Sequence, residues 1–262
     1  MAPEHTLPEL EGVLNFREMG GLDGAGGTIR SGQIFRSGHW STATDGDLEV
    51  LSSLGVQTVV DLRLDTDRAG DGGDNRAAPG VEIIHMPMVD SSGHSGEIRE
   101  VLMSGDRQRM IDNYGDGKAH QMAIDGAVAQ AREPEKREVY ARFIDHVATT
   151  DAPLLFHCSA GKDRAGWAAT VIGMALGVND DDLVEHYLLS NVHRSPESRR
   201  AYYESRGIDV DVVMPFLGVH ADYITGALAA VDEDFSSREA YLTEGLGFGP
   251  ERVEQLRAKY LS

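Results

Sequence analysis

The junction around residue 158 constrains the fold of this chain more than any other part of its sequence. A short apolar run at Pro153 to Phe156 predicts a buried strand. The mostly apolar residues from Arg164 to Leu176, followed by Gly177, predict a buried helix with a glycine at its end. Between them lies the loop HCSAGKDRAG, which holds the only cysteine, Cys158. The sequence therefore places Cys158 after a strand and at the mouth of a helix.

This position suits a thiolate that attacks phosphorus. Backbone N–H groups around a helix start form an anion nest, and the helix dipole adds partial positive charge there. Both favour ionisation of the Cys158 thiol, and the planar fork of Arg164 can hold two phosphoryl oxygens. Gly161 suits a tight turn. The alternative is that Cys158 is a small buried core residue, and the agreement of strand, loop, glycine, arginine and helix speaks against it.

The motif His-Cys-x-x-Gly-Lys-Asp-Arg resembles the signature loop of the atypical bacterial tyrosine and dual-specificity phosphatases, a family with a secreted mycobacterial member. The resemblance extends over almost the whole chain. Its other matching segments are Asn15 to Glu18, Ile34 to Ser37, Val60 to Arg63, Tyr187 to Asn191, Leu217 to Val219 and the tail to Leu261. It implies an α/β fold with a central, mostly parallel sheet flanked by helices.

The resemblance also implies roles for the loop residues. Cys158 would be the nucleophile and Arg164 the clamp on the phosphate and the transition state, while Lys162 and Asp163 mark the atypical subgroup. With these, Ser159, Ala160 and Gly161 complete the predicted phosphate contacts. A lysine in this loop is similar to the feature that relatives use for phosphoserine, phosphothreonine and phosphoinositides as well as phosphotyrosine.

One position departs from the family. Most relatives carry Ser or Thr directly after the arginine, where its hydroxyl helps the cysteine sulfur to leave the phosphocysteine intermediate, whereas this chain has Ala165. We expect a less activated thiolate and slower breakdown of that intermediate. Ser159 could compensate, but its direction is not readable from sequence.

The first chemical step also needs a proton for the leaving oxygen. Asp90 is the predicted donor, because it follows a candidate strand at Val81 to His85 and lies in a segment that resembles the acid-bearing loop of the family. The alternative is an ordinary solvated loop aspartate in a chain with 43 acidic residues. Asp163 is the rival donor, since it lies nearer the phosphate in sequence.

Three further arginines stand in stretches that match the family, namely Arg17, Arg36 and Arg63. Arg63 follows an apolar strand at Val56 to Asp61, and the carboxyl ends of parallel strands face the ligand in open α/β sheets. All three are candidate substrate contacts. The alternatives are structural bracing of the site and surface ion pairs.

Two polar stretches and one helical region complete the predicted architecture of a single phosphatase domain over residues 1–262. Residues 65 to 80 are rich in Asp and Gly and predict a mobile loop. Residues 91–132 form a long polar insertion, predicted as a helical lid over the pocket, with a disordered or decorative loop as the alternative. Residues 180–262 predict a helical C-terminal part.

Composition limits the partners and the chemistry. The formal net charge of −19 argues against nucleic acid and against adsorption to anionic membranes, and no apolar run approaches the length of a membrane span. Phosphorylated substrates are the expected partners. No spaced Cys or His cluster indicates zinc, and cysteine-based phosphoryl transfer needs neither metal nor cofactor. No secretory signal is visible, so we expect a cytoplasmic protein, with leaderless export left open.

The sequence thus predicts a cysteine-dependent phosphomonoesterase that acts through phosphocysteine, on phosphotyrosine or on a broader set of phosphoproteins and phosphoinositides. Two alternatives stay open. The first is a phosphatase of a nucleotide, a sugar phosphate or a biosynthetic intermediate. The second, prompted by Ala165, is a weakly active module that binds phosphorylated ligands.

Overall fold

The computed structural model describes residues 7–90 and 94–262 of the chain. Its centre is a five-stranded sheet in the order β1-β4-β7-β5-β6, in which only β1 runs antiparallel to its neighbour. The strands are β1 (Arg17–Glu18), β4 (Ile34–Ser37), β5 (Thr58–Asp61), β6 (Glu82–His85) and β7 (Leu154–His157), and a separate hairpin joins β2 (Asp23–Gly24) to β3 (Gly27–Thr28). The predicted mostly parallel sheet is confirmed.

The register of the parallel strands brings their carboxyl ends to one edge. Ser37 pairs with His157, His157 with Asp61, and Asp61 with His85. The loop that holds Cys158 therefore leaves the sheet between the ends of β4 and β5, where open α/β sheets place their ligand sites.

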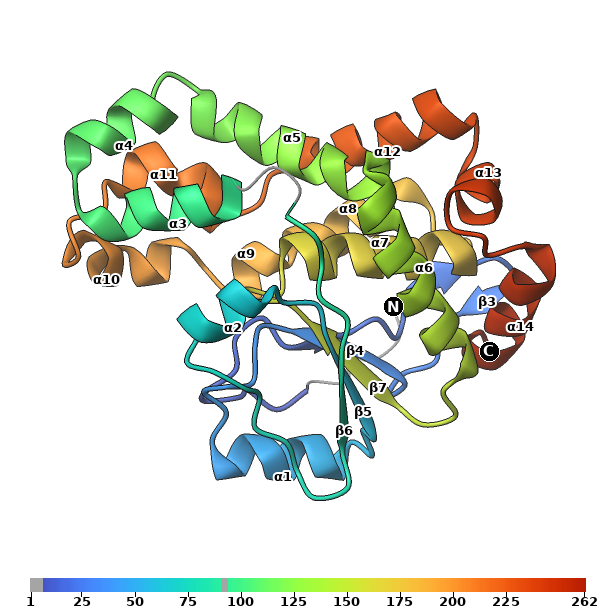
Figure 1. Cartoon of the computed structure of the whole chain (residues 1–262). Coiled ribbons are helices and arrows are strands. Elements are labelled where there is room, and N and C mark those ends of the chain that lie inside the picture. The colour runs from blue at the N-terminus through green and yellow to red at the C-terminus, as the bar shows by residue number, and fades with distance from the viewer. Residues whose placement is uncertain (1–6, 91–93) are drawn as a thin grey trace.

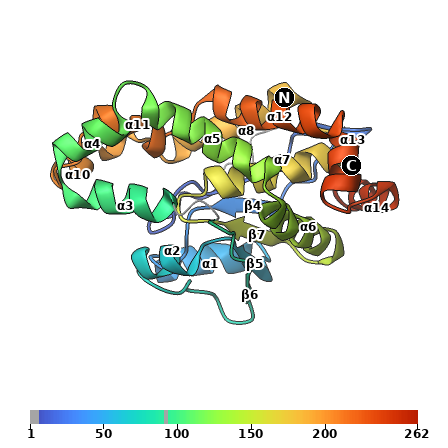
Figure 2. The ribbon, with the colours of Figure 1, turned by 45° about the horizontal axis from the view of Figure 1, so that its top comes forward.

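Helices cover both faces of the sheet (Figures 1 and 2). On one side lies α1, with a small apolar core that includes Trp40 and Phe35. The larger core lies on the other side and includes Phe143, Phe156 and Ile172. The helices that follow the strands of the sheet or flank it are α1 (Asp45–Ser53), α2 (Asp65–Gly70), α6 (Pro134–Thr149) and α7 (Asp163–Leu176).

Local sequence explains the limits of the central helix α7. It begins directly after the glycine-containing loop and ends at Gly177, whose φ of 76° is the left-handed value that favours glycine after a helix. All its residues from Ala165 to Leu176 are buried. The predicted strand, loop and buried helix are present as expected.

The insertion is helical where it is described, and residues 91–93 lie outside the described residues. It comprises α3 (His94–Ser104), α4 (Arg107–Tyr114) and α5 (Lys118–Arg132). Helix α5 packs along α12 and also against α6 and α7, so it belongs to the helical layer above the sheet. The role of the insertion as a lid stays a prediction.

The C-terminal part is helical, as predicted. Its segments are α8 (Asp180–Leu188), α9 (Ser190–His193), η1 (Glu197–Arg199), α10 (Arg200–Glu204), α11 (Val210–Leu217), α12 (Ala221–Phe235), α13 (Arg238–Ala240), η2 (Tyr241–Gly245) and α14 (Pro250–Tyr260). Among the described helices, none is by itself long and apolar enough to cross a membrane, and only α11 and α12 taken together, bent by 45°, meet that criterion.

The segment at residues 65 to 80, predicted as a mobile loop, is irregular from residue 71 onward but begins with a short helix. It contains α2, whose first turn is capped by the Asp67 carboxylate, which accepts from the Leu64 N–H at 3.1 Å. The segment is rich in Asp and Gly and has no apolar periodicity, and such a sequence predicts a loop. Two of its residues contact positions distant in sequence: Asn75 accepts from the Trp40 N–H at 3.0 Å, and Asp67 forms an ion pair with Arg164.

Candidate functional site

Cys158 follows β7 directly and is 2% exposed. The loop then turns through Gly161, whose φ is +71°. A Cβ at that position would lie 2.2 Å from the Ser37 carbonyl oxygen, well inside contact distance. Glycine is required here both for its dihedral angle and for the close approach of β4, as its place in the motif indicated.

The four successive carbonyl groups of residues 159–162 all point away from the loop centre. The His39 N–H donates to the first at 3.1 Å, and the Asn15 side-chain amide donates to the second at 3.1 Å. Arg36 donates to the third and the fourth, at 2.8 Å and 3.2 Å. The N–H groups of the same residues have no acceptor within the described part of the chain. Turned-out carbonyls and available N–H groups form an anion cup.

Arg36 is fully buried beneath this cup. Burial lowers the pKa of its guanidinium to about 10, while Cys158, Tyr187 and Asp163 oppose that shift. Arg36 therefore stays charged at neutral pH and supports the loop from its carbonyl side. It has no access to a substrate in this arrangement.

Arg17 and Arg63 are buried too, and protein groups bind both. Arg17 donates to the Asn15 side chain and, at 3.0 Å, to the Ser190 hydroxyl, and burial lowers its pKa well below the usual value. Arg63 forms an ion pair with Asp61 at 2.9 Å. The contacts of all three arginines match the bracing alternative, so we leave them out of the set that touches substrate.

Arg164 lies at the first turn of α7, and its side chain is 19% exposed. It forms an ion pair with Asp67, and its other terminal nitrogen lies 3.4 Å from the Ser159 hydroxyl. Burial lowers the pKa of Arg164, but Cys158, Asp67 and Asp163 outweigh it, and the net shift is upward. The guanidinium is held charged beside the cup, and a bound phosphoryl group would share it with Asp67.

The Lys162 side chain points away from the cup, and the Asp163 side chain lies beside its amine. The Lys162 ammonium donates to the carbonyl oxygens of Phe216 at 2.6 Å and Gly218 at 3.0 Å, and burial lowers its pKa. Lys162 thus ties the loop to the end of α11, and its amine is not aimed at a substrate. The Asp163 side chain is 50% exposed and lies 3.5 Å from that amine.

A buried polar network holds the other side of Cys158. His157 donates from Nδ1 to the Cys158 carbonyl at 2.9 Å, and its Nε2 accepts from the Asn75 amide at 2.9 Å. Asn75 also donates to Asp61 at 2.9 Å and accepts from Arg63 at 3.1 Å. Burial lowers the pKa of His157 to about 4, which Asp61 only partly offsets. A neutral His157 therefore positions the backbone of the nucleophile.

The position directly after Arg164 is not exposed to solvent. Ala165 is completely buried, and the hydroxyl of Ser159 is directed toward Arg164 and the cavity. The structure thus supplies no sign that Ser159 replaces the missing hydroxyl at residue 165.

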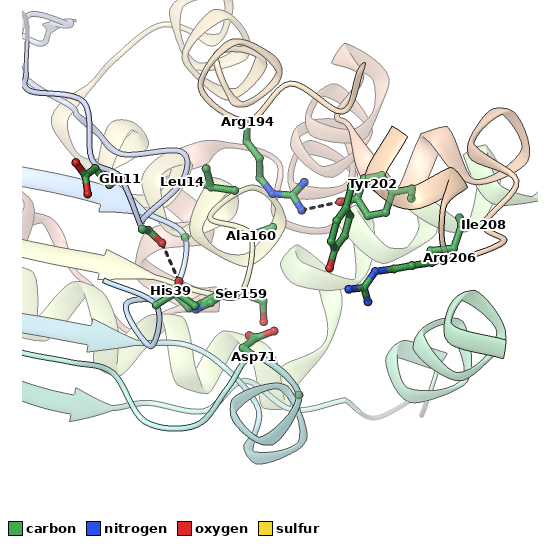
Figure 3. Close-up of a pocket in the computed structure, with 15 residues that line it drawn as sticks. Glu11, Leu14, His39, Asp71, Ser159, Ala160, Arg194, Tyr202, Arg206 and Ile208 are labelled. Atoms are coloured by element: carbon green, nitrogen blue, oxygen red, sulfur yellow. Dashed lines mark hydrogen bonds between the residues drawn. The ribbon is translucent and has the colours of Figure 1, made fainter. Parts of the chain in front are cut away.

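A cavity of about 820 Å³ opens onto the loop and is lined by Ser159 and Ala160. Asp71 lies on the same side as Ser159, and the two side chains point toward one another (Figure 3). The opposite wall carries Arg194, which donates to the Tyr203 hydroxyl at 3.2 Å, and Arg206, whose guanidinium lies 4.3 Å from the Tyr202 ring centre. The cavity meets the loop at Ser159 and Ala160, and its lining includes neither Cys158 and Arg164 nor Asp90 and Asp163.

Sequence reasoning missed several residues of the site, namely Asn15, His39, Asp67, Asp71, Asn75, Arg194, Tyr202, Tyr203 and Arg206. Asn15 lay inside a matching segment, so its place in the motif was a usable signal. Asp67, Asp71 and Asn75 lie in the segment interpreted as a loop, where no local pattern separates them from other acidic and polar residues.

Comparison with known proteins agrees with this geometry. A model of the tyrosine phosphatase family matches residues 8–262. A Cupriavidus necator protein with a provisional tyrosine-protein phosphatase name is 33% identical over 259 residues, which covers 95% of this chain and 86% of that protein. The triple specificity protein phosphatase PtpB of Mycobacterium tuberculosis is 28% identical, with 98% and 99% covered, and a tyrosine-protein phosphatase of Nostoc commune is 24% identical, with 88% and 75% covered. The resemblance proposed from the motif is confirmed: the chain belongs to the tyrosine phosphatase family and thereby to the phosphoric monoester hydrolases.

Proposed function

We propose that this enzyme cleaves phosphate monoesters through a phosphocysteine intermediate formed on Cys158. One observation carries the proposal. Three residues, Asn15, Arg36 and His39, donate hydrogen bonds to the outward carbonyls of residues 159–162 next to the cysteine, with Arg164 beside them. Such an arrangement stabilises an anionic sulfur before attack and the phosphoryl oxygens during attack.

The reaction would take place in two steps. The Cys158 thiolate attacks phosphorus, the S–P bond forms and the P–O bond to the leaving group breaks as an acid gives that oxygen a proton. Water then attacks the phosphocysteine, the same group accepts a proton from the water, and phosphate leaves as the thiolate is regenerated. Arg164 would bind two phosphoryl oxygens in both steps, in place of Asp67.

The scheme needs an acid that faces the leaving oxygen. Asp90 and Asp163 are the sequence predictions, and Asp71 is the carboxylate that lines the cavity beside Ser159. We assign the role to Asp71, because the donor must reach the leaving oxygen above the cup. The leaving group tests this: an acid contributes more for an alkyl ester than for p-nitrophenol, which leaves readily as an anion.

The substrate range follows from the cavity and from the relatives. A cavity of about 820 Å³ is large enough for a phosphorylated side chain with its neighbours or for a headgroup with more than one phosphate. The wall of the cavity opposite Asp71 carries two tyrosines and two arginines, namely Tyr202, Tyr203, Arg194 and Arg206. PtpB carries triple specificity in its name, and we infer a protein-tyrosine and dual-specificity phosphatase that also accepts phosphoinositides.

A panel of phosphate esters, assayed with variants, tests the proposal. Cys158→Ser should abolish hydrolysis of p-nitrophenyl phosphate, and rapid acid quenching of the wild type should show phosphate bound to Cys158. Asp71→Asn should lower the rate on phosphoserine peptides far more than on p-nitrophenyl phosphate, whereas Asp90→Asn and Asp163→Asn should lower both alike.

Four outcomes would overturn parts of the proposal. Activity that survives in Cys158→Ser would exclude the cysteine mechanism. Selective turnover of one nucleotide or sugar phosphate would point to a metabolic phosphatase, and tight binding without turnover would favour a binding module. A leaving-group effect in Asp90→Asn and not in Asp71→Asn would move the acid to Asp90.

A further inference from the structure

Two histidines and an aspartate meet at the surface away from the phosphate loop. His120 lies in the first turn of α5, and His220 and Asp222 lie at the start of α12. One ligating atom of each lies within 4.8 Å of the others. None of the three lines the cavity at the loop, and the described site chemistry does not use them.

The packing of the two helices holds the three side chains together. Helix α5 runs along α12, and His220 stands in extended conformation just before α12, with no side-chain bond to the helix end. The His120 and His220 ring centres are 5.1 Å apart. His120 Nε2 lies 2.6 Å from Asp222 Oδ2, with side chains 34% and 50% exposed. Solvent therefore has access to one side of the cluster.

A buried tyrosine orients the His120 ring from behind. The Tyr223 hydroxyl donates to the Pro215 carbonyl at 3.2 Å. His120 Nδ1 lies 3.4 Å from the hydroxyl oxygen of Tyr223. This contact at Nδ1 leaves Nε2 facing the Asp222 carboxylate, an arrangement that suits either an Nε2–H that donates to Asp222 or a metal ion bound by both groups. A histidine ligand fixed through its other nitrogen is the usual support of a metal site.

From this geometry we propose that His120, His220 and Asp222 form a zinc site, with water as the fourth ligand. Two imidazoles and one carboxylate suit Zn²⁺, which takes four ligands of mixed nitrogen and oxygen type. Mg²⁺ prefers an octahedral set of oxygens and would bind poorly. The members lie about a hundred positions apart in sequence, which explains why no spaced cluster indicated a metal.

The site would connect the insertion to the support of the phosphate loop. His220 ends the α11–α12 connection, and the carbonyl oxygens that hold the Lys162 amine belong to Phe216 in the last turn of α11 and to Gly218 directly after it. Bound zinc would therefore fasten α5 to the segment that anchors Lys162. Its expected effect is on the stability of this contact, since none of its ligands touches the cup.

Zinc titration in the Cys158→Ser background tests the proposal, because that variant removes the active-site thiolate as a competing ligand. After treatment with a chelator, calorimetry with Zn²⁺ should show one equivalent bound, and Co²⁺ should give the visible absorption of a four-coordinate site. His220→Ala and Asp222→Asn should each weaken binding by more than about tenfold, and Tyr223→Phe by about tenfold. His193→Ala, an exposed histidine on α9, is the matched control and should bind as the parent does.

Thermal unfolding gives a second readout. Zn²⁺ should raise the melting temperature of the parent and of His193→Ala, but not of His220→Ala. His220→Ala should fold, because its side chain caps nothing. No zinc binding by the parent, or the same one-site titration in His220→Ala and Asp222→Asn, would overturn the proposal. Either result leaves the hydrolysis mechanism untouched.

Discussion

Replacement of Gly161 by alanine should disable the phosphate loop for a reason that the geometry makes quantitative. Gly161 has φ +71°, and its new Cβ would lie 2.2 Å from the Ser37 carbonyl oxygen and 2.6 Å from the Gly38 nitrogen. Ordinary contact begins at 3.4 Å, so the loop must move by about 1.2 Å relative to β4. A displacement of about 1 Å in a reacting group costs on the order of 100-fold in rate, or about 2.7 kcal/mol of activation free energy.

Gly32→Ala is the matched control. Gly32 has nearly the same dihedral, φ +74°, yet a Cβ there meets nothing within 4 Å. Both variants should lose about 1 kcal/mol of stability from the left-handed backbone, and only Gly161→Ala should carry the further cost of the clash. Comparison of the two separates backbone strain from loop displacement.

The assay is kcat/KM on p-nitrophenyl phosphate together with urea unfolding of each variant. We expect Gly161→Ala to lose about 100-fold in kcat/KM while remaining folded, and Gly32→Ala to keep nearly all activity. Activity of Gly161→Ala within about threefold of Gly32→Ala would refute the reasoning, because the loop would then tolerate a shift of more than 1 Å.

Three further outcomes follow from the site. Ala165→Thr, or the smaller Ala165→Ser, should raise steady-state turnover about tenfold by stabilising the leaving sulfur, and unchanged turnover with an unchanged burst amplitude in stopped-flow assays would count against this. Asn75→Ala should cost about 2 kcal/mol in urea unfolding because buried partners lose their hydrogen bonds, while the exposed Asn113→Ala should cost little. The pKa of His157 is lowered to about 4, so the unfolded chain alone binds its proton as pH falls from about 6.5. Between about pH 6.5 and pH 4, the free energy of unfolding of the wild type should fall by about 3 kcal/mol. That of His157→Asn should fall clearly less. Equal pH dependence of the two proteins would contradict the buried network.

The parts of the site that the sequence predicted are those in which function depends on neighbours in the chain. The apolar run before Cys158, the glycine of the turn and the apolar face of α7 lie within 25 residues, so periodicity and turn chemistry reveal strand, loop and helix together. The family motif then assigned the chemistry. No comparable local signal exists for Asp71 or Asn75, whose positions depend on contacts with Arg63, Trp40 and His157.

The same lack of a local signal explains why the sequence does not reveal the bracing role of Arg17, Arg36 and Arg63. In a chain with net charge −19, an arginine is most often solvated or in a surface ion pair. Arg36 is instead fully buried, and its Nη2 donates to two loop carbonyls, while Nε and Nη1 have no hydrogen-bond partner within the described residues. Such burial is tolerable only where backbone acceptors converge, and convergence is a property of the folded sheet.

Buried positive charge also resolves how an acidic protein can attract a phosphate dianion. The overall field of a chain with net charge −19 repels such a substrate. Beneath the cup, however, Arg36 keeps its charge because its pKa of about 10 lies well above neutrality. Arg164 is held charged at the rim by Cys158 and Asp67, whose influence exceeds that of burial. Charges in a low-dielectric interior act strongly at short range, whereas solvent and salt screen the surface charges. Attraction in this enzyme therefore acts at short range, from Arg36 and Arg164 at the cup and from Arg194 and Arg206 on the cavity wall, which favours substrates that fit the cavity over substrates that are merely highly charged.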